Sequence, residues 1–426
     1  MNILPKYKFG DFGKTLIRFA SSQIISQFLR VASGFLVVSF IEPELYGQFT
    51  GVGVFMGYIL LGHGGIINGL SRELPFELGR GNDEYGRQMA SSVFVLSLLL
   101  SLLASLVFFF FAVFFFLQGD NLTGIIYLSY VVIGGLFLLN SQYLPTLYRT
   151  NKDFNSLSRQ NILVGIGNLL TVVLVYFFSI YGLLARGILL AVYQFTLLYI
   201  NKPYKISFKY SLSHYKTLIK TGIPIFMVGQ INPLWATIMN NLIFSIGGAT
   251  NYGLYALSTI VQSTVGVIPI SFSGVIYPRM SIMLGEGKTI GQILKSNIKP
   301  LFFQFGVMLI IAFAGVLLLP IIIPEILPKY VNGIEAAQWM LFSPVMQSFG
   351  ALNNIYNVVK KQKLYFVSLV FGAVAGSAFI FFSIQMYDFD LVIFPQGLLI
   401  GKFLQQGLSL LFISVLLKNE RSENKS

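Results

Sequence analysis

Long apolar runs separated by short polar stretches repeat along the whole chain. A helix that crosses a bilayer needs about 20 mostly apolar residues, because the hydrocarbon layer is roughly 30 Å thick. About twelve runs have this length, and they predict an all-α integral membrane protein. The predicted spans are 15–41, 47–70, 90–117, 123–147, 159–180, 182–201, 217–246, 252–278, 298–323, 336–359, 365–386 and 392–417.

The basic residues occupy alternate loops. If the N-terminus lies in the cytoplasm, 24 of the 29 Lys and Arg residues fall in cytoplasmic loops or tails. Of the basic residues the opposite loops hold only Arg186 and Lys329, and they also hold seven of the 16 acidic residues. Because cytoplasmic loops of membrane proteins are enriched in Lys and Arg, we predict an even number of spans with both termini cytoplasmic. The first run is too long for a signal peptide and is expected to remain as the first span.

Composition excludes several classes of protein. Hydrophobic residues make up 55% and charged residues 11% of the 426 residues, and the mean hydropathy is +0.74, whereas soluble proteins carry about 25% charged residues. The net charge of +13 is spread over all inner loops, which argues against a nucleic-acid-binding patch. The sequence has no cysteine, two distant histidines and no P-loop. We therefore expect no metal, no cofactor and no enzymatic activity.

A weak duplication divides the chain. Tyr46-Gly47 begins a glycine-rich apolar run that ends at Leu78-Gly79-Arg80-Gly81. Tyr252-Gly253 begins a similar run, of the same length, that ends at Leu284-Gly285-Glu286-Gly287. Six spans per copy keep both copies the same way up. The repeat thus predicts two six-helix bundles, 1–201 and 217–426, joined by a cytoplasmic linker, 202–216, and related by a pseudo-twofold axis along the membrane normal.

The loops that flank the second span identify a family. The stretch that begins at Ser71-Arg72-Glu73 does not match the G-x-x-x-D-R-x-G-R-[RK] loop of major facilitators. Glu42-Pro43-Glu44-Leu45-Tyr46-Gly47, the glycine-rich span, Arg72-Glu73-Leu74-Pro75 and Gly79-Arg80-Gly81 resemble the polysaccharide flippase family instead, including O-antigen flippases of the Wzx type. These belong to the multidrug/oligosaccharidyl-lipid/polysaccharide exporter superfamily.

The resemblance implies a fold, a substrate and partners. It implies a MATE-like fold and an undecaprenyl-diphosphate-linked glycan as substrate, which would be moved from the inner to the outer leaflet of the bacterial cytoplasmic membrane. It also implies contact with membrane lipid, a polysaccharide polymerase and a chain-length regulator.

Two cations lie deep inside predicted spans. Arg30 and Lys402 are each about 21–23 Å from the inner end of their helices. No Asp or Glu lies well inside any predicted span, and a cation at mid-bilayer costs at least about 2.5–3.5 kcal/mol. We therefore predict that both side chains face a shared aqueous cavity, where the resemblance supplies the diphosphate as an anion. Alternatively, helix carbonyls or a water pocket satisfy them. Arg18, Arg72 and Arg279 are assigned to a cytoplasmic gate or to recruitment of the head group.

Neutral amides form a second candidate group, because Asn and Gln supply the donors and acceptors that sugars need without strong charge. The spacing places two sets of three residues on single helix faces. We predict that the glycan path is lined by Gln230, Asn232, Thr237 and Asn241 on the seventh span and by Gln347, Asn354 and Asn357 on the tenth. Hydrogen bonding between helices is the alternative role for these residues.

Two other functions remain open. A cation-coupled multidrug or organic-cation antiporter of the same fold would need a membrane-embedded carboxylate, and no predicted span contains one. A non-transporting scaffold of a glycan-assembly complex would have no use for Arg30 and Lys402. The charge of the cavity discriminates between the flippase and the antiporter, since a cationic cavity favours the flippase.

Overall fold

The computed structural model describes residues 9–79, 81–151, 153–208, 211–285, 287–359, 361–387 and 389–423. Within these ranges the regular elements are all helices and no strand occurs, which confirms the predicted all-α class. The chain divides into two compact units. Unit 1 consists of Met1–Ile41 and Gln48–Gln230, and unit 2 consists of Glu42–Gly47 and Ile231–Ser426.

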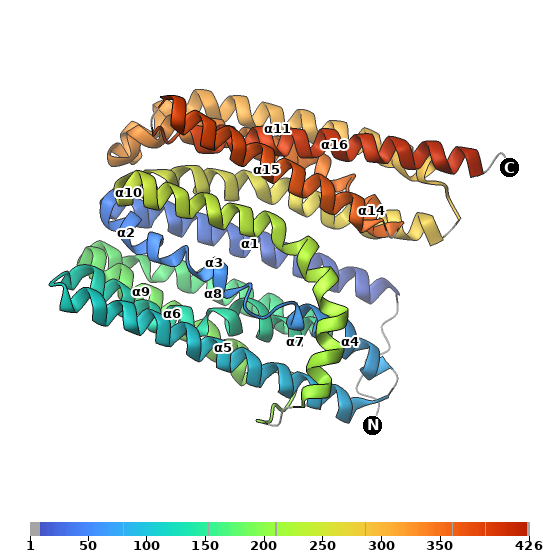
Figure 1. The fold of residues 1–426 in the computed structure, drawn as a ribbon, viewed down its shortest axis with the longest axis horizontal. Coiled ribbons are helices and arrows are strands. Elements are labelled where there is room, and N and C mark those ends of the chain that lie inside the picture. Colours follow the sequence, from blue (N-terminus) through green and yellow to red (C-terminus); the bar gives the residue numbers. More distant parts are fainter. Residues whose placement is uncertain are drawn as a thin grey trace. The chain divides into compact units, whose positions relative to one another are not determined.

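Unit 1 is built from long helices that lie side by side and several short ones (Figure 1). Its neighbouring pairs include α5 with α6 and α1 with α8. The elements that contribute to it are α1 (Phe9–Phe40), α2 (Pro43–Gly53), α3 (Met56–Ile59), α4 (Ile66–Gly79), α5 (Asp83–Leu117), α6 (Asn121–Leu138), the π-helix η1 (Leu139–Tyr143), α7 (Leu144–Thr150), α8 (Phe154–Leu170), α9 (Val172–Ile200) and the start of α10 (Leu212–Gly285).

Unit 2 contains the rest of α10 and the helices that follow it. Its long helices α15 and α16 lie against one another (Figure 1). The later elements are α11 (Ile290–Ile326), the 3-10 helix η2 (Pro328–Gly333), α12 (Ile334–Met340), α13 (Phe342–Gln347), the 3-10 helix η3 (Ser348–Ala351), α14 (Asn354–Val358), α15 (Gln362–Tyr387) and α16 (Ile393–Glu423).

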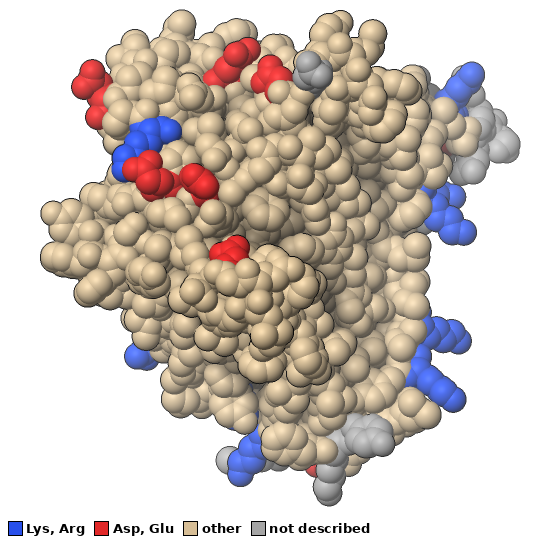
Figure 2. Space-filling model, turned by 60° about the vertical axis from the view of Figure 1, so that its left-hand side comes forward, with Lys and Arg blue, Asp and Glu red and all other residues tan. Residues whose placement is uncertain are grey.

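The helices account for the predicted spans, although not each by one straight helix. Eight stretches of the described chain are long and apolar enough to cross a membrane. One of them, Leu212–Ile270, covers the predicted span 217–246 and most of 252–278, and the backbone turns between the two at Gly248, where φ is +74°. The predicted spans 47–70, 159–180 and 336–359 fall on helices that are broken into shorter pieces. Most of the face shown in Figure 2 carries neither acidic nor basic side chains, as expected of a surface that contacts lipid.

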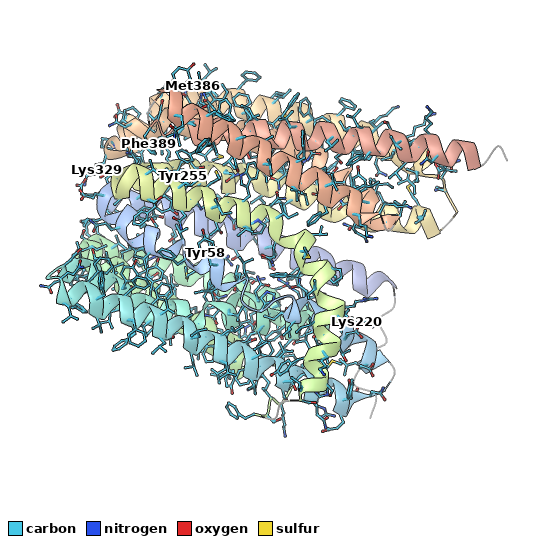
Figure 3. All side chains as sticks on the ribbon, in the orientation of Figure 1. Tyr58, Lys220, Tyr255, Lys329, Met386 and Phe389 are labelled. Carbon is cyan, nitrogen blue, oxygen red and sulfur yellow. The ribbon has the colours of Figure 1, made fainter. Side chains whose placement is uncertain are left out.

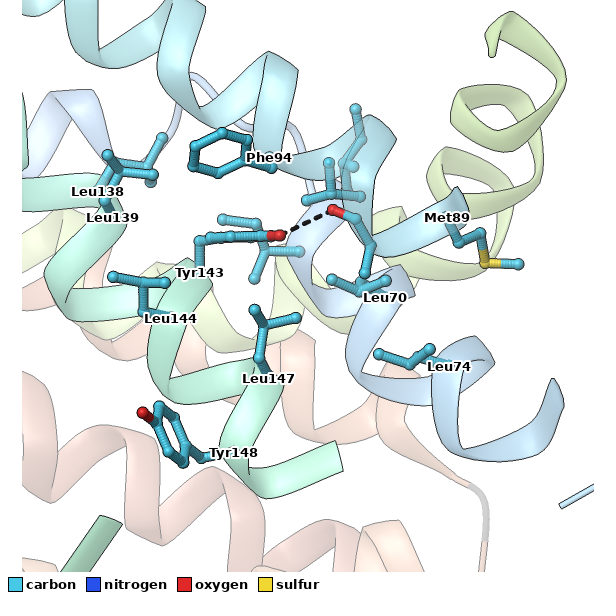
Figure 4. Close-up of a cluster of buried hydrophobic side chains, with 14 of the residues drawn as sticks. Leu70, Leu74, Met89, Phe94, Leu138, Leu139, Tyr143, Leu144, Leu147 and Tyr148 are labelled. Atoms are coloured by element: carbon cyan, nitrogen blue, oxygen red, sulfur yellow. Dashed lines mark hydrogen bonds between the residues drawn. The ribbon is translucent and has the colours of Figure 1, made fainter. Parts of the chain in front are cut away.

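The core of unit 1 is organised around two buried tyrosines. Tyr143 ends the π-helical turn η1 and lies among leucines and Phe94 (Figure 4). Its hydroxyl donates to the carbonyl of Ala90 at 2.8 Å. The hydroxyl of Tyr148 donates in the same way to the carbonyl of Leu198 at 2.8 Å. Each hydroxyl thus finds an acceptor inside an apolar core, where an unsatisfied polar group would cost about 1–3 kcal/mol.

Arg186 is part of the helix packing of unit 1. The sequence places it at the outer end of the predicted span 182–201, and the structure places it on α9, beyond the backbone kink at Ser179. Its Nη2 donates to Ser33 Oγ on α1 at 2.8 Å, to Asn168 Oδ1 on α8 at 3.2 Å and to the carbonyl of Asn168 at 3.3 Å. Asn168 is two residues before the end of α8, where carbonyls lack intrahelical partners. Arg186 therefore joins three helices through neutral oxygens.

Both Tyr-Gly pairs of the duplication lie in unit 2. The backbone at Gly47 approaches the carbonyl of Ala249, and the backbone at Gly253 approaches the carbonyl of Pro43, so closely that neither position has room for a Cβ. Beside them, Lys329 (labelled in Figure 3) forms an ion pair with Glu42. Residues 42–47 are thereby packed onto unit 2, although their neighbours in sequence belong to unit 1.

Candidate functional site

A cavity of about 550 Å³ lies within unit 2. Its walls come from α10, from the broken tenth span (α13, η3 and α14), from α15 and from α16. Most of the polar residues in the lining are neutral amides, hydroxyls and phenols. The lining residues are Asn232, Pro233, Trp235, Ala236, Met239, Asn240, Tyr255, Thr259, Gln262, Pro269, Ile270, Ser273, Gln347, Gly350, Asn354, Tyr365, Leu398, Lys402, Gln405 and Gln406.

Lys402 supplies the only charged side chain of this lining. Its Nζ donates to Ser343 Oγ at 2.7 Å, and Gln262 Nε2 donates to the same oxygen at 3.2 Å. Ser343 is fully buried on α13. An ammonium group has three protons to donate, and within the described residues one such bond of Lys402 is seen, to a neutral oxygen. The cavity therefore presents a cation to whatever enters it.

Close packing of α15 and α16 fixes the position of Lys402. A Cβ on Gly401 would lie 2.5 Å from the carbonyl of Gly372 and from the ring of Trp235. Trp235 comes from α10, is 6% exposed and donates its Nε1–H to Ser377 Oγ at 3.1 Å. Small residues at such spacing let helix backbones approach closely in a membrane. The indole ring fits against the glycines, so that α10, α15 and α16 hold the next residue of α16, Lys402, at the cavity wall.

The amides of the broken tenth span bond to the helices on both sides of it. Asn354 Nδ2 donates to Ser273 Oγ of α10 at 2.9 Å. Asn353 Nδ2 donates to Gln406 Oε1 of α16 at 3.1 Å, and its Oδ1 accepts from Ser409 Oγ at 2.6 Å. The 3-10 turn η3 lies just before these residues. Of the predicted residues on this span, Gln347 and Asn354 line the cavity, whereas Asn357 is exposed and does not line it.

On α10 the cavity is lined by a different face from the predicted one. Asn232 lines the cavity as predicted, together with Ala236, Met239 and Asn240. Gln230, Thr237 and Asn241 are outside the lining, and Gln230 is the last residue of unit 1. At about 100° per residue, the lining face and the predicted face are turned by about 140° from one another. Thr237 instead donates to the carbonyl of Pro233 at 2.9 Å.

Three of the predicted arginines, Arg18, Arg30 and Arg72, lie outside the lining of this cavity. Arg30 is an exposed residue of α1 in unit 1, so its predicted pairing with Lys402 stays a prediction. Arg18 is exposed, and its Nη1 donates to Asn155 Oδ1 at 3.4 Å. Arg72 is exposed on α4. The side chain of Arg279 is outside the described part of the structure.

Several lining residues were not predicted. Gln405 and Gln406 follow Lys402 by three and four residues, which places them on the same helix face; this spacing was a signal in the sequence. Thr259 and Gln262 are likewise three residues apart on α10. They are distant in sequence from the other lining residues and reach the same cavity because the chain turns back at Gly248. The sequence alone does not show this turn. Among the described residues, no group of His, Asp, Glu or Cys has the arrangement of a metal site.

The sequence matches a known protein family. Residues 79–331 match the family described as polysaccharide biosynthesis protein, which is more than half of the 426 residues. The chain belongs to the polysaccharide biosynthesis protein family. This confirms the family that the loops around the second span indicated. No curated protein sequence matches the chain.

The fold of this polysaccharide biosynthesis protein is that of solved transporters of the MOP superfamily. An inward-facing multidrug resistance MATE family transporter is 17% identical, with a TM-score of 0.75 over 92% of this chain and 96% of the other. An outward-facing one is 16% identical, with a TM-score of 0.64 over 95% and 96%. A MOP superfamily transporter from Pyrococcus furiosus, described as having a binding pocket of reverse polarity, is 16% identical, with a TM-score of 0.61 over 95% and 96%. These likenesses confirm the MATE-like fold.

Proposed function

We propose that this protein is a flippase for a polyprenyl-diphosphate-linked oligosaccharide. It would move an O-antigen or exopolysaccharide repeat unit from the inner to the outer leaflet of the bacterial cytoplasmic membrane by alternating access. The main support for this proposal is the lining of the unit 2 cavity, which combines many neutral amides and hydroxyls with a single cation, Lys402, and no carboxylate. Membership of the polysaccharide biosynthesis family supports the class of cargo.

The lining suits a glycan better than an organic cation. Sugar hydroxyls both donate and accept, and so do the amides of Asn232, Gln347 and Asn354. The volume of about 550 Å³ falls within the range of small-molecule sites, about 300–1,000 Å³. A bound organic cation would face the ammonium of Lys402 with no acidic group in the lining to offset the repulsion. The cavity thus disfavours the multidrug antiporter among the two transport functions.

Different residues of the proposed site would bind different parts of the substrate. Lys402 attracts an anionic group of the substrate, and Arg30 on α1 is proposed to act on the same anion. The lining amides hold the sugars, while the lipid tail stays in the bilayer. Arg18, Arg72 and Arg279 would help to recruit the anionic head group at the cytoplasmic surface, where each cation is worth about 1 kcal/mol. An inside-negative membrane potential favours export of negative charge by about 2.3 kcal/mol per charge per 100 mV.

The test is a reconstituted flipping assay. The purified protein is placed in proteoliposomes with undecaprenyl-diphosphate-linked oligosaccharide, and the glycan that reaches the other leaflet is measured with a lectin or glycosidase that cannot cross the membrane. We expect faster flipping than in protein-free liposomes, and no competition by organic cations such as tetraphenylphosphonium. Competition by the cation together with no glycan movement would favour the multidrug antiporter. No movement of either would favour the scaffold.

A further inference from the structure

The second predicted span of unit 1 is interrupted at a histidine. α3 ends at Ile59 and α4 begins at Ile66, and residues 60–65 between them form turns. Gly64 and Gly65 have φ values of +52° and +86°, a left-handed conformation that is available to glycine at little cost. The imidazole of His63 therefore lies on a turn and not on a continuous helix.

His63 accepts a hydrogen bond from its own turn. Its side chain is 2% exposed, and its Nδ1 accepts the N–H of Gly65 at 3.1 Å. The ring packs edge-on against Phe226 of α10, with centroids 4.9 Å apart. An imidazole nitrogen that accepts a hydrogen bond carries no proton, so the geometry assigns the neutral ring with its proton on Nε2. The bond between the Gly65 N–H and Nδ1, which adds to the backbone hydrogen bonds of this turn, therefore requires a neutral His63.

Charged groups near His63 are few on every element packed against it. α5, which contacts Gly62 through Leu100, has no charged residue between Gln88 and Leu117. On α10 the nearest is Lys220 (labelled in Figure 3), six residues before Phe226 and exposed. On the broken span itself the nearest is Arg72, also exposed. Among the described residues, none of these forms a hydrogen bond or ion pair with His63, whereas the Gly65 N–H donates to its ring.

The turn is in backbone contact with the first part of α10. A Cβ on Gly65 would lie 2.9 Å from the carbonyl carbon and oxygen of Gly222, and a Cβ on Gly69 would lie 2.2 Å from the carbonyl oxygen of Leu218. Because no side chain separates the two backbones at these glycines, a movement of the turn would displace α10. That helix has helical backbone up to Gly248, and on the way it supplies Asn232 and Asn240 to the cavity.

We infer that His63 is a proton-binding site that couples proton uptake to movement of the cavity wall. A proton from water adds to Nδ1 and converts it from an acceptor into a donor. Two donors, Nδ1–H and the Gly65 N–H, then face each other, so the bond is lost and the turn rearranges against α10. The inference rests on the proposed transport function and adds a proton as the coupling ion.

A direct test uses the fact that the chain has only two histidines, His63 and His214. The protein with His214→Gln is labelled with ¹⁵N in the histidine ring and in the glycine amides, placed in lipid nanodiscs and followed by NMR from pH 4 to pH 8. We expect the His63 ring to change from the neutral Nε2–H tautomer to the imidazolium, with a simultaneous shift of the Gly65 amide. A ring that stays neutral over the whole range, or a Gly65 amide that does not follow it, would overturn the inference.

A transport assay separates this inference from the proposed function. His63→Gln keeps an acceptor for Gly65 but binds no proton. We expect an imposed pH gradient to change the wild-type flipping rate about tenfold, equivalent to about 1.4 kcal/mol, and to leave the His63→Gln rate unchanged. His214→Gln is the matched control and should respond as the wild type does. If His63→Gln keeps the full response, the coupling is wrong. If the wild type moves no glycan but His63 titrates with Gly65, the proposed function fails and the proton site stands.

Discussion

Arg186 in unit 1 and Lys402 in unit 2 are both cations within long apolar helices, and they differ in what surrounds them. One nitrogen of Arg186 contacts three neutral oxygens on α1 and α8. Lys402 shares one serine oxygen with Gln262 and lines a cavity of about 550 Å³. The planar guanidinium can hold several acceptors in fixed geometry, whereas the ammonium is a compact point charge on a flexible stem. An in-span cation therefore indicates a binding site where it lines a cavity, as Lys402 does, and a structural contact where it joins helices, as Arg186 does.

Reversing the charge of Lys402 should have the largest effect. We expect Lys402→Glu to lower glycan export by about 100-fold, because an unpaired carboxylate in the cavity would repel an anionic substrate. Lys402→Arg should keep part of the activity. The measurement is surface glycan in a flippase-deleted strain at matched protein abundance, with Lys418→Glu, an exposed change on the same helix, as control. Normal glycan with Lys402→Glu would show that Lys402 is structural, as Arg186 is.

Arg30 tests whether the cationic site extends beyond unit 2. It is exposed on α1, and no hydrogen bond of its side chain is seen among the described residues. If it faces the same anion as Lys402, Arg30→Glu should lower export by at least about tenfold, and Arg30→Lys should restore part of it. The same strain and abundance controls apply. Wild-type glycan from Arg30→Glu would restrict the site to the unit 2 cavity.

A change at Arg186 should lower the stability of the protein and leave its transport activity nearly unchanged, the opposite of a change at Lys402. Arg186→Ala removes the contacts that join α9 to α1 and α8, and we expect a loss of about 1–3 kcal/mol. The purified variant should show a lower Tm, while its flipping rate per folded molecule stays close to that of the wild type. A normal Tm together with lost flipping would place Arg186 in the transport site and reverse the comparison.

The smallest effects should come from the two serines that accept from these cations. Ser33 and Ser343 are both fully buried. Ser33→Ala should lower the Tm slightly, corresponding to about 1 kcal/mol. Ser343→Ala should instead change the flipping rate, by a few-fold, because it frees both Lys402 and Gln262. A cycle with Gln262→Ala should be non-additive; additivity would mean that the three residues do not act together.

Much of the fold was readable in the sequence because the bilayer imposes it. Apolar length sets where helices cross, so all twelve predicted spans fall on helices. The loops around Tyr46-Gly47 and Arg72 indicated the family that residues 79–331 confirm. The absence of acidic residues from the predicted spans singled out Lys402, which lines the cavity with Asn232, Gln347 and Asn354.

Only the tertiary structure decided which helix faces meet. In a membrane the lipid-facing and protein-facing positions are both apolar, so periodicity does not show how a span is rotated. On α10 that rotation is set by Trp235, which packs against Gly376 and Gly401 and turns Asn240 toward the cavity and Asn241 away from its lining. The turn at His63 and the three acceptors of Arg186 likewise depend on contacts between helices distant in sequence. The sequence by itself determined the class, the spans and the residue types available for binding, because burial in lipid is a property of each segment. Their partners were decided by packing, because close approach depends on several helices at once.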